Sequence, residues 1–204
     1  VCLSKTSTQE KVEKVKVMVY YEALCSDSRY FFKQHLRPVT EKLSNFLDIA
    51  LVPYGKASVK INGKYYFKCQ HGEKECYANK IHACAIEALG NMTLAVMMTE
   101  CMIADNRDAD KALLRVIIKF LIVIPLLCAD QEQIDPEPIW NCASNGYGSV
   151  LLKKHGDDTD LISPTFIPTI TINGSIGDQF SIFRQFLFEV CKFIDWPLPP
   201  PCLE

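Results

Sequence analysis

Short hydrophobic runs typical of buried strands lie near both ends of the chain, and the middle of the chain shows helical periodicity. Residues 15–21 (VKVMVYY) are β-branched and aromatic between polar neighbours, which predicts a core strand. Residues 26–28 (SDS) favour a helix start, so we expect a helix from there to about Leu36, with a break or kink at Pro38. Residues 47–55 (LDIALVPYG) predict a second strand. This strand–helix–strand order suggests a parallel βαβ start.

The middle of the chain begins with a hairpin pattern. Residues 58–61 (SVKI) and 64–68 (KYYFK) are strand-like and flank an Asn-Gly pair, which favours a tight turn. From about residue 74 to 127 the hydrophobic residues follow helical spacing, and the methionines there are expected to fill the core. Residues 130–148 are rich in Pro, Gly, Asn and Asp and are predicted as a loop.

A strand pattern returns near the C-terminus, so the middle block looks like a helical insertion. Residues 166–174 (FIPTITING) predict a strand that begins near Pro168, and a short strand at residues 175–176 is expected to pair with it. Residues 178–193 predict one amphipathic helix. The residues expected on its buried face are Phe180, Phe183, Leu187 and Val190.

Charge and hydropathy argue against two classes of partner. The net charge is -2, and no lysine/arginine stripe interleaved with aromatics is present, so nucleic acid is not an expected partner. The apolar run at residues 112–128 is interrupted by Arg115, Lys119 and Pro125. It is too short to cross a bilayer and is predicted to be a buried helix.

Cysteine content points to an oxidising compartment. The chain has ten cysteines and two glycosylation sequons, Asn91-Met92-Thr93 and Asn173-Gly174-Ser175. We therefore expect a secreted or lumenal glycoprotein carrying glycans on Asn91 and Asn173. The chain opens with a polar stretch, so no signal peptide is expected within it.

Cys25 lies where the first strand is predicted to meet a helix. Helix N-termini stabilise a thiolate, with Arg29 assisting and Asp27 opposing, so Cys25 is a candidate reactive thiol. The alternative is a structural half-cystine, and position alone does not choose between the two. Ile167-Pro168, at the start of the late strand, is similar to the cis-proline that faces the cysteine in thioredoxin-like folds. There it would bind an extended substrate peptide.

The segment CQHGEKECYANKIHAC (residues 69–84) could hold zinc or form disulfides. Its spacing matches no common zinc finger, and secretory chains oxidise such cysteines, so disulfides are favoured and no metal or other cofactor is expected. Gln70 and Asn79 are expected to hydrogen-bond the loop. The residues of the zinc alternative are Cys69, His71, Cys76, His82 and Cys84.

The same segment resembles the signature of the gamma-interferon-inducible lysosomal thiol reductase family. It has the order Cys-Gln-His-Gly, two variable residues, Glu-Cys, two variable residues, Asn, four variable residues, Cys. YYEALC, LVPYG and a Pro-x-x-x-x-Asn-Gly element are also similar to that family, and the resemblance runs from about Val15 to Cys202.

The resemblance implies an α/β, thioredoxin-like fold interrupted by a disulfide-stabilised α-helical insertion. The thioredoxin-like domain would comprise residues 15–60 and 161–194, the insertion residues 61–160, and the C-terminal tail residues 195–204. The eight cysteines expected to pair among themselves are Cys69, Cys76, Cys84, Cys101, Cys128, Cys142, Cys191 and Cys202, with Cys191–Cys202 as one bond. Cys2 is left for a possible disulfide-linked homodimer.

The resemblance also implies reduction of protein disulfides at acidic pH through a Cys-x-x-Cys pair, with Cys25 as the nucleophile. Ser28 stands at the position of the resolving cysteine. A serine cannot form a disulfide, so the mixed disulfide can leave only by reversal or by attack from an external thiol such as glutathione. Dithiol reduction is therefore expected to be impaired or absent, while the Ser28 hydroxyl is expected to hydrogen-bond the thiolate.

Three hypotheses follow from this departure. The first is a thiol-disulfide oxidoreductase that acts on protein disulfides through a single cysteine. The second is a secreted, non-catalytic binding or modulatory protein that uses the same scaffold on a protein partner. The third is a structural role in which Cys25 is tied into a disulfide.

Overall fold

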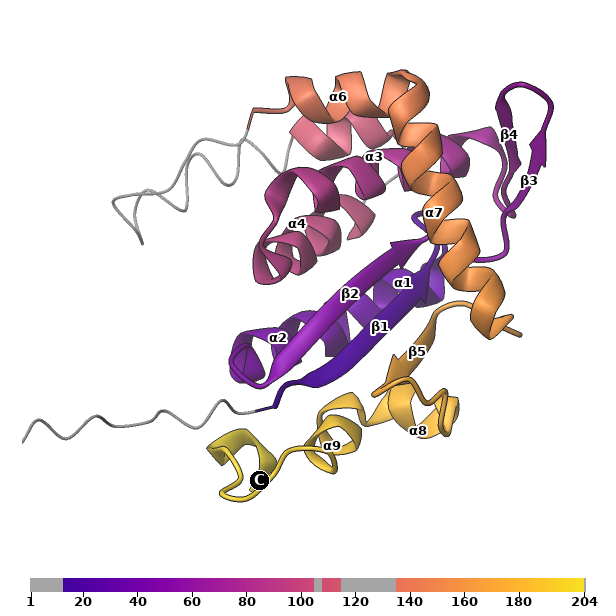
Figure 1. The fold of residues 1–204 in the computed structure, drawn as a ribbon. Coiled ribbons are helices and arrows are strands. Elements are labelled where there is room, and N and C mark those ends of the chain that lie inside the picture. The colour runs from indigo at the N-terminus through magenta and orange to yellow at the C-terminus, as the bar shows by residue number, and fades with distance from the viewer. Residues whose placement is uncertain (1–12, 105–107, 115–134, 204) are drawn as a thin grey trace, which may run out of the picture.

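The computed structural model describes residues 13–104, 108–114 and 135–203, and its centre is a three-stranded sheet (Figure 1). The strand order is β2-β1-β5. β1 (Val15–Tyr21) pairs in parallel with β2 (Leu47–Pro53) and antiparallel with β5 (Thr169–Ile172). These strands confirm the predicted βαβ start and the late strand. Ser175 makes a single bridge to Ile172 in place of the short strand expected there.

The crossover from β1 to β2 is one continuous helical segment. It comprises α1 (Ser26–Phe31), the π-helical turn η1 (Phe32–Leu36) and α2 (Arg37–Leu43). The predicted end near Leu36 is wrong. The wide π turn precedes Pro38, which has no N–H to donate, and the buried side chains of Val39 and Leu43 keep the next turns helical against the sheet.

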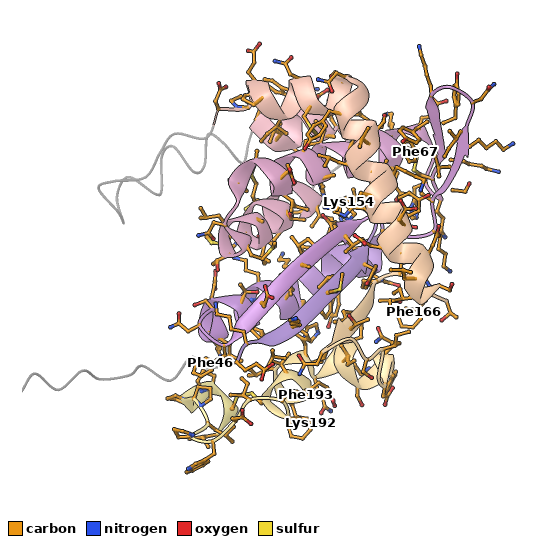
Figure 2. All side chains as sticks on the ribbon, viewed as in Figure 1. Phe46, Phe67, Lys154, Phe166, Lys192 and Phe193 are labelled. Carbon is orange, nitrogen blue, oxygen red and sulfur yellow. A yellow bond between two sulfur atoms is a disulfide. The ribbon has the colours of Figure 1, made fainter. Side chains whose placement is uncertain are left out.

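The predicted hairpin is confirmed. β3 (Ser58–Ile61) and β4 (Tyr65–Lys68) pair antiparallel, and Gly63 in the turn has a φ of +66°. Phe67 lies between this hairpin and the helical group (Figure 2), where the Lys80 ammonium stands 5.6 Å from the centre of its ring. This contact attaches the hairpin to the helices.

Several of the described helices between β4 and β5 form a group along the β2 edge of the sheet (Figure 1). They are α3 (Glu73–Leu89), α4 (Met92–Ala104), α6 (Glu137–Ser144) and α7 (Gly146–Ile162). The loop predicted over residues 130–148 is wrong from Glu137 onward. Pro136 tolerates the first turn of a helix, and burial of Ile139 and Ala143 holds α6 in place.

Two clusters of buried apolar side chains meet at α4. Val96 and Ile103 join the cluster around the sheet, whereas Met98 and Met102 join the cluster among α3, α6 and α7. Met98 and Met102 are fully buried, so the core-filling role expected for the methionines is confirmed for these two. The domain boundaries expected near residues 60 and 160 stay predictions.

The C-terminal region differs from the single helix predicted over residues 178–193. The structure has α8 (Gln179–Arg184) and α9 (Phe186–Cys191), because Gln185 leaves helical geometry. Phe180 is 67 % exposed, so its predicted burial is wrong, whereas Val190 is buried as predicted. Phe183 and Leu187 are partly buried, and Ile182 and Phe186 are the other buried residues of these two helices. A short 3-10 turn, η3 (Pro200–Cys202), ends the described chain.

Across the described ranges, no helix combines the length and the apolar character needed to cross a membrane. The buried helix predicted at residues 112–128 lies largely outside those ranges. Only its first three residues are described, and Ala112 and Leu113 among them are buried.

Candidate functional site

Cys25 occupies the N-cap position of α1, directly after the loop that leaves β1. Its backbone is extended, and its Sγ atom accepts a hydrogen bond from the Ser28 N–H at 3.5 Å. Within the described residues the thiol is free and partly exposed. The hypothesis that ties Cys25 into a disulfide is therefore wrong in this structure. The predicted strand-to-helix placement of the thiol is confirmed.

The Ile167-Pro168 peptide bond lies opposite the thiol and is cis, as expected from the sequence. The Cys25 thiol donates to the Ile167 carbonyl oxygen, with 3.6 Å between the sulfur and oxygen atoms. Residues 142 positions apart in the chain thus meet at the sulfur. Binding of a substrate peptide at Ile167 and Pro168 stays a prediction.

Ser28 is fully buried, and its hydroxyl forms a different hydrogen bond from the one that the sequence predicted. The hydroxyl oxygen accepts a hydrogen bond from the Glu22 N–H at 3.4 Å. Contact with the Cys25 sulfur comes instead from the backbone N–H of Ser28. The expected hydroxyl–thiolate hydrogen bond is thus replaced by one from the main chain, which any residue except proline at position 28 could supply.

Asn79 holds the loop between β1 and Cys25. Its side-chain Oδ1 accepts a hydrogen bond from the Ala23 N–H at 2.9 Å, and the side chain is fully buried. The sequence predicted that Asn79 would bond its own loop, but α3 carries it to the loop that contains Cys25. The middle of the signature segment therefore supports the thiol from a distance in sequence.

The cysteines of the signature segment are oxidised. The S–S distances are 2.04 Å for Cys69–Cys76 and 1.97 Å for Cys84–Cys142. The zinc alternative that used Cys69, Cys76 and Cys84 is wrong, because all three form disulfides. The Cys191–Cys202 bond expected from the sequence is present.

The remaining cysteines depend on undescribed residues. Cys128, the predicted disulfide cysteine in the long apolar run, lies outside the described residues, and so does Cys2 with the predicted dimer bond. The place of Cys101 among the eight paired cysteines therefore stays a prediction.

Sequence reasoning missed two buried carboxylates behind the Cys25 loop. Glu22 is 1 % exposed and Glu75 is fully buried, and both face the half-exposed His71. The His71 Nδ1 atom lies 2.5 Å from Glu75 Oε2 and 3.5 Å from Glu22 Oε2. Burial raises the pKa of Glu22, and the nearby Glu75 raises it further, while the N–H of Lys56 lowers it. The signal available in the sequence was the presence of Glu22 in YYEALC and of Glu75 in CQHGEKEC, two segments that carry the family resemblance.

Gly55 provides the room that Glu22 occupies. It has a φ of +59°, and a Cβ atom at this position would lie 2.2 Å from Glu22 Cγ. The next residue, Lys56, donates its N–H to Glu22 Oε1 at 2.8 Å. The three segments YYEALC, LVPYG and CQHGEKEC therefore converge on the Glu22 carboxylate.

An open cavity of about 920 Å³ is lined by α1 from Ser26 onward. The Tyr30 and Phe183 rings stack on its wall with 5.6 Å between their centres, and Arg29 and Arg184 add positive charge.

Both predicted glycosylation asparagines are exposed. Asn91 Oδ1 accepts from the Leu94 N–H, and Asn173 Oδ1 accepts from the Lys16 N–H at 2.8 Å. The oxygen is the engaged atom in each case, and a glycan bonds to the nitrogen. Glycosylation at these positions stays a prediction.

Comparisons with known proteins agree with this geometry. A family model described as "Gamma interferon inducible lysosomal thiol reductase (GILT)" matches residues 16–117. A GILT-like protein of Anopheles gambiae is 36% identical over 198 residues, covering 94% of this chain and 81% of that protein. The thiol reductase of Mus musculus is 31% identical over 176 residues, covering 85% of this chain and 66% of that protein.

Solved structures agree on the fold. BdbD from Bacillus subtilis superposes with a TM-score of 0.57 at 12% identity, covering 90% of this chain and 91% of that one. DsbA from Xylella fastidiosa gives 0.54 at 13%, covering 90% and 88%. The thioredoxin-like fold with a helical, disulfide-bonded region is therefore confirmed.

Proposed function

Because the chain belongs to the gamma-interferon-inducible lysosomal thiol reductase family, we propose that it is a thiol-disulfide oxidoreductase that acts through the single nucleophile Cys25. The family match and the thioredoxin-like fold support thiol–disulfide exchange with protein disulfides. The single-cysteine mechanism rests on one observation: a free thiol at a helix N-terminus beside a cis-proline, with a buried serine three residues on.

The first step is attack by the Cys25 thiolate on one sulfur of a substrate disulfide. The Cys25–substrate bond forms, the substrate disulfide breaks, and the other substrate sulfur leaves as a thiolate. The Ser28 N–H and the amide dipoles of the helix stabilise negative charge on the Cys25 sulfur. Before ionisation the neutral thiol donates a hydrogen bond to the Ile167 carbonyl oxygen, and on ionisation its proton passes to solvent.

The second step needs a thiol from outside the chain. Ser28 has no sulfur to attack the mixed disulfide, and its hydroxyl is engaged by Glu22 N–H. A thiolate such as that of glutathione attacks the substrate sulfur or the Cys25 sulfur, and a further thiol completes reduction of the resulting mixed species. Two external thiols thus supply the two electrons that reduce one protein disulfide.

The experiment compares the parent chain with Ser28→Cys and Cys25→Ser in the reduction of a protein disulfide by glutathione between pH 4.5 and 7. We expect slow, glutathione-dependent turnover by the parent and an isolable mixed disulfide at Cys25. Ser28→Cys should release the mixed disulfide at least about a hundredfold faster, because a positioned intramolecular thiol acts at high effective concentration. Cys25→Ser should fall to the uncatalysed background.

A second candidate function is a secreted binding or modulatory protein without turnover. The serine at position 28 supports it, because a nucleophile without a resolving thiol can retain a partner covalently. Glutathione-independent capture, with no turnover by the parent and turnover restored by Ser28→Cys, would favour this candidate. Parent turnover that survives Cys25→Ser would contradict both.

A secretory or endolysosomal location is proposed with either function. The relatives named as lysosomal thiol reductases, the three disulfides and the two exposed sequons support it. Glycosidase treatment followed by mass analysis of the secreted chain tests Asn91 and Asn173 directly.

A further inference from the structure

Three side chains with metal-binding atoms converge at the loop of residues 22–25 that carries Cys25. Glu22 comes from the end of β1, His71 from the loop before α3, and Glu75 from the first turn of α3. One oxygen or nitrogen atom from each lies within 4.8 Å of the other two. The thiol exchange proposed for Cys25 uses none of these atoms.

Glu22 is the unusual member of this cluster. Its Oε1 is fixed by the Lys56 N–H, whereas its Oε2 is buried and has no hydrogen-bond partner within the described part of the chain. That oxygen faces His71 Nδ1 at 3.5 Å. A buried carboxylate oxygen without a donor is costly unless a positive charge or a proton reaches it.

Glu75 adds a second buried negative charge. Both of its oxygens face His71, with the backbone N–H at 3.0 Å from Oε1 and Nδ1 at 2.5 Å from Oε2. A neutral His71 leaves two carboxylates unbalanced, and a protonated one offsets a single charge. A divalent cation would balance both carboxylates.

The donor set selects among cations. One imidazole nitrogen with two carboxylate oxygens fits Zn²⁺, whereas Ca²⁺ and Mg²⁺ prefer oxygen ligands throughout. The His71 side chain is 40 % exposed, which leaves a path for the ion and for water at a fourth position. The Cys69–Cys76 disulfide closes the loop around His71 and Glu75, so two of the ligands are held on a short, cross-linked segment.

We propose that Glu22, His71 and Glu75 form a binding site for a divalent transition-metal cation, with Zn²⁺ the best match, three protein ligands and one solvent-facing position. The site joins the Cys25 loop to the signature segment through the ion. It is independent of the proposed thiol exchange, because Cys25 supplies no ligand.

The test measures Zn²⁺ binding by calorimetry at pH 7.5 on the full chain carrying Cys25→Ser, which removes the reactive thiol as a competing ligand. We expect one strong site per chain. Glu22→Gln keeps the shape and the Lys56 contact, and His71→Ala changes a half-exposed residue. Each should weaken binding at least about a hundredfold, more than loss of an outer-sphere partner does.

Glu73→Gln is the matched control, because Glu73 is an exposed carboxylate in the same turn of α3. It should leave the affinity unchanged. Zinc should also raise the thermal midpoint of the Cys25→Ser chain and of the control, and leave that of Glu22→Gln unmoved. Anomalous X-ray scattering at the zinc edge should place the ion on the three side chains.

Absence of stoichiometric zinc binding at pH 7.5 would overturn the proposal and indicate that the two carboxylates share a proton instead. Binding that is equally strong in Glu22→Gln, or an anomalous peak elsewhere, would overturn it as well. His71→Ala keeps the test decisive if Glu22→Gln fails to fold, since its side chain reaches the surface.

Discussion

The two sides of the loop at residues 22–25 differ in what surrounds them. On the Cys25 side, one partly exposed sulfur forms its hydrogen bonds, among the described residues, with main-chain groups, the Ser28 N–H and the Ile167 carbonyl. On the Glu22 side, buried charged and polar side chains from the signature segment face the loop. The difference fits the proposed roles, in which Cys25 is the nucleophile and the signature segment holds the loop in place.

The largest effect on stability is expected from a change confined to the helices that support the loop. Replacing Cys84 and Cys142 by serine opens a disulfide that spans 58 residues and ties α3 to α6. We expect the free energy of unfolding to fall by about 4 kcal/mol, from the entropy that the cross-link removes from the unfolded chain. Denaturant unfolding followed by circular dichroism measures it.

The matched comparison for that variant is Cys25→Ser, which removes a sulfur without a cross-link. Its stability should lie within about 0.5 kcal/mol of the parent, because serine also caps a helix N-terminus and can accept the Ser28 N–H. If both variants lost the same stability, the proposed division between a supporting disulfide and a reactive Cys25 would be wrong.

Asn79→Ala tests the contact that joins the two sides. Loss of the Asn79 oxygen removes the buried hydrogen bond at 2.9 Å from the Ala23 N–H, which should lower the unfolding free energy by about 1–3 kcal/mol. The loop should also shift, so iodoacetamide should label Cys25 at a changed rate. Gln70→Ala, at an exposed position of the same signature, should change neither quantity. A normal labelling rate in Asn79→Ala would show that the thiol needs no such support.

His82 should make the supporting side sensitive to acid. It is fully buried next to the Tyr21 hydroxyl, and burial lowers its pKa to about 3. Between the ordinary histidine pKa and that value, the unfolded chain binds a proton that the folded chain does not, so stability falls as pH falls. From pH 7 to 5 this residue should cost about 2 kcal/mol of unfolding free energy.

The comparison for this pH effect is His82→Gln, which retains polar atoms but does not titrate. Its unfolding free energy, measured with denaturant at both pH values, should change less than that of the parent by the same amount. If the unfolding free energies of the two chains change equally between the two pH values, His82 does not govern the acid response.

The smallest expected effects belong to the exposed charges beside Cys25. Asp27→Asn should speed alkylation of the thiol and Arg29→Gln should slow it, each by about two- to fivefold, the size of a single charge near a helix end. Stopped-flow labelling at low and high salt measures both. An effect that does not shrink in salt would contradict an electrostatic origin.

Sequence reasoning located the elements whose signals are local. The β-branched run of β1, the Asn-Gly turn of the hairpin and the Cys191–Cys202 bond each depend on residues close together in the chain. The same holds for the cis bond before Pro168, which a short motif indicated.

The errors arose where distant packing decides the outcome. Phe180 has the right spacing for a buried face, but a break at Gln185 rotates it outward. Residues 137–144 have a loop-like composition, yet contact with α3 makes them helical. The meeting of Glu22 with His71 and Glu75 needs three separate segments in place, which no local pattern specifies.

In the described part of the chain, three disulfides occur together with the free thiol of Cys25, and this combination restricts the medium in which the protein can work. A medium reducing enough to open Cys69–Cys76 would loosen the signature segment that supports the Cys25 loop. A strongly oxidising medium would instead oxidise the Cys25 thiol. The chain therefore keeps both its disulfides and its free Cys25 thiol only over a limited range of redox potential, and reduction of the disulfides sets one end of that range. The concentration of reductant therefore decides whether an assay observes the chain with intact disulfides or the loosened chain that remains after they are reduced.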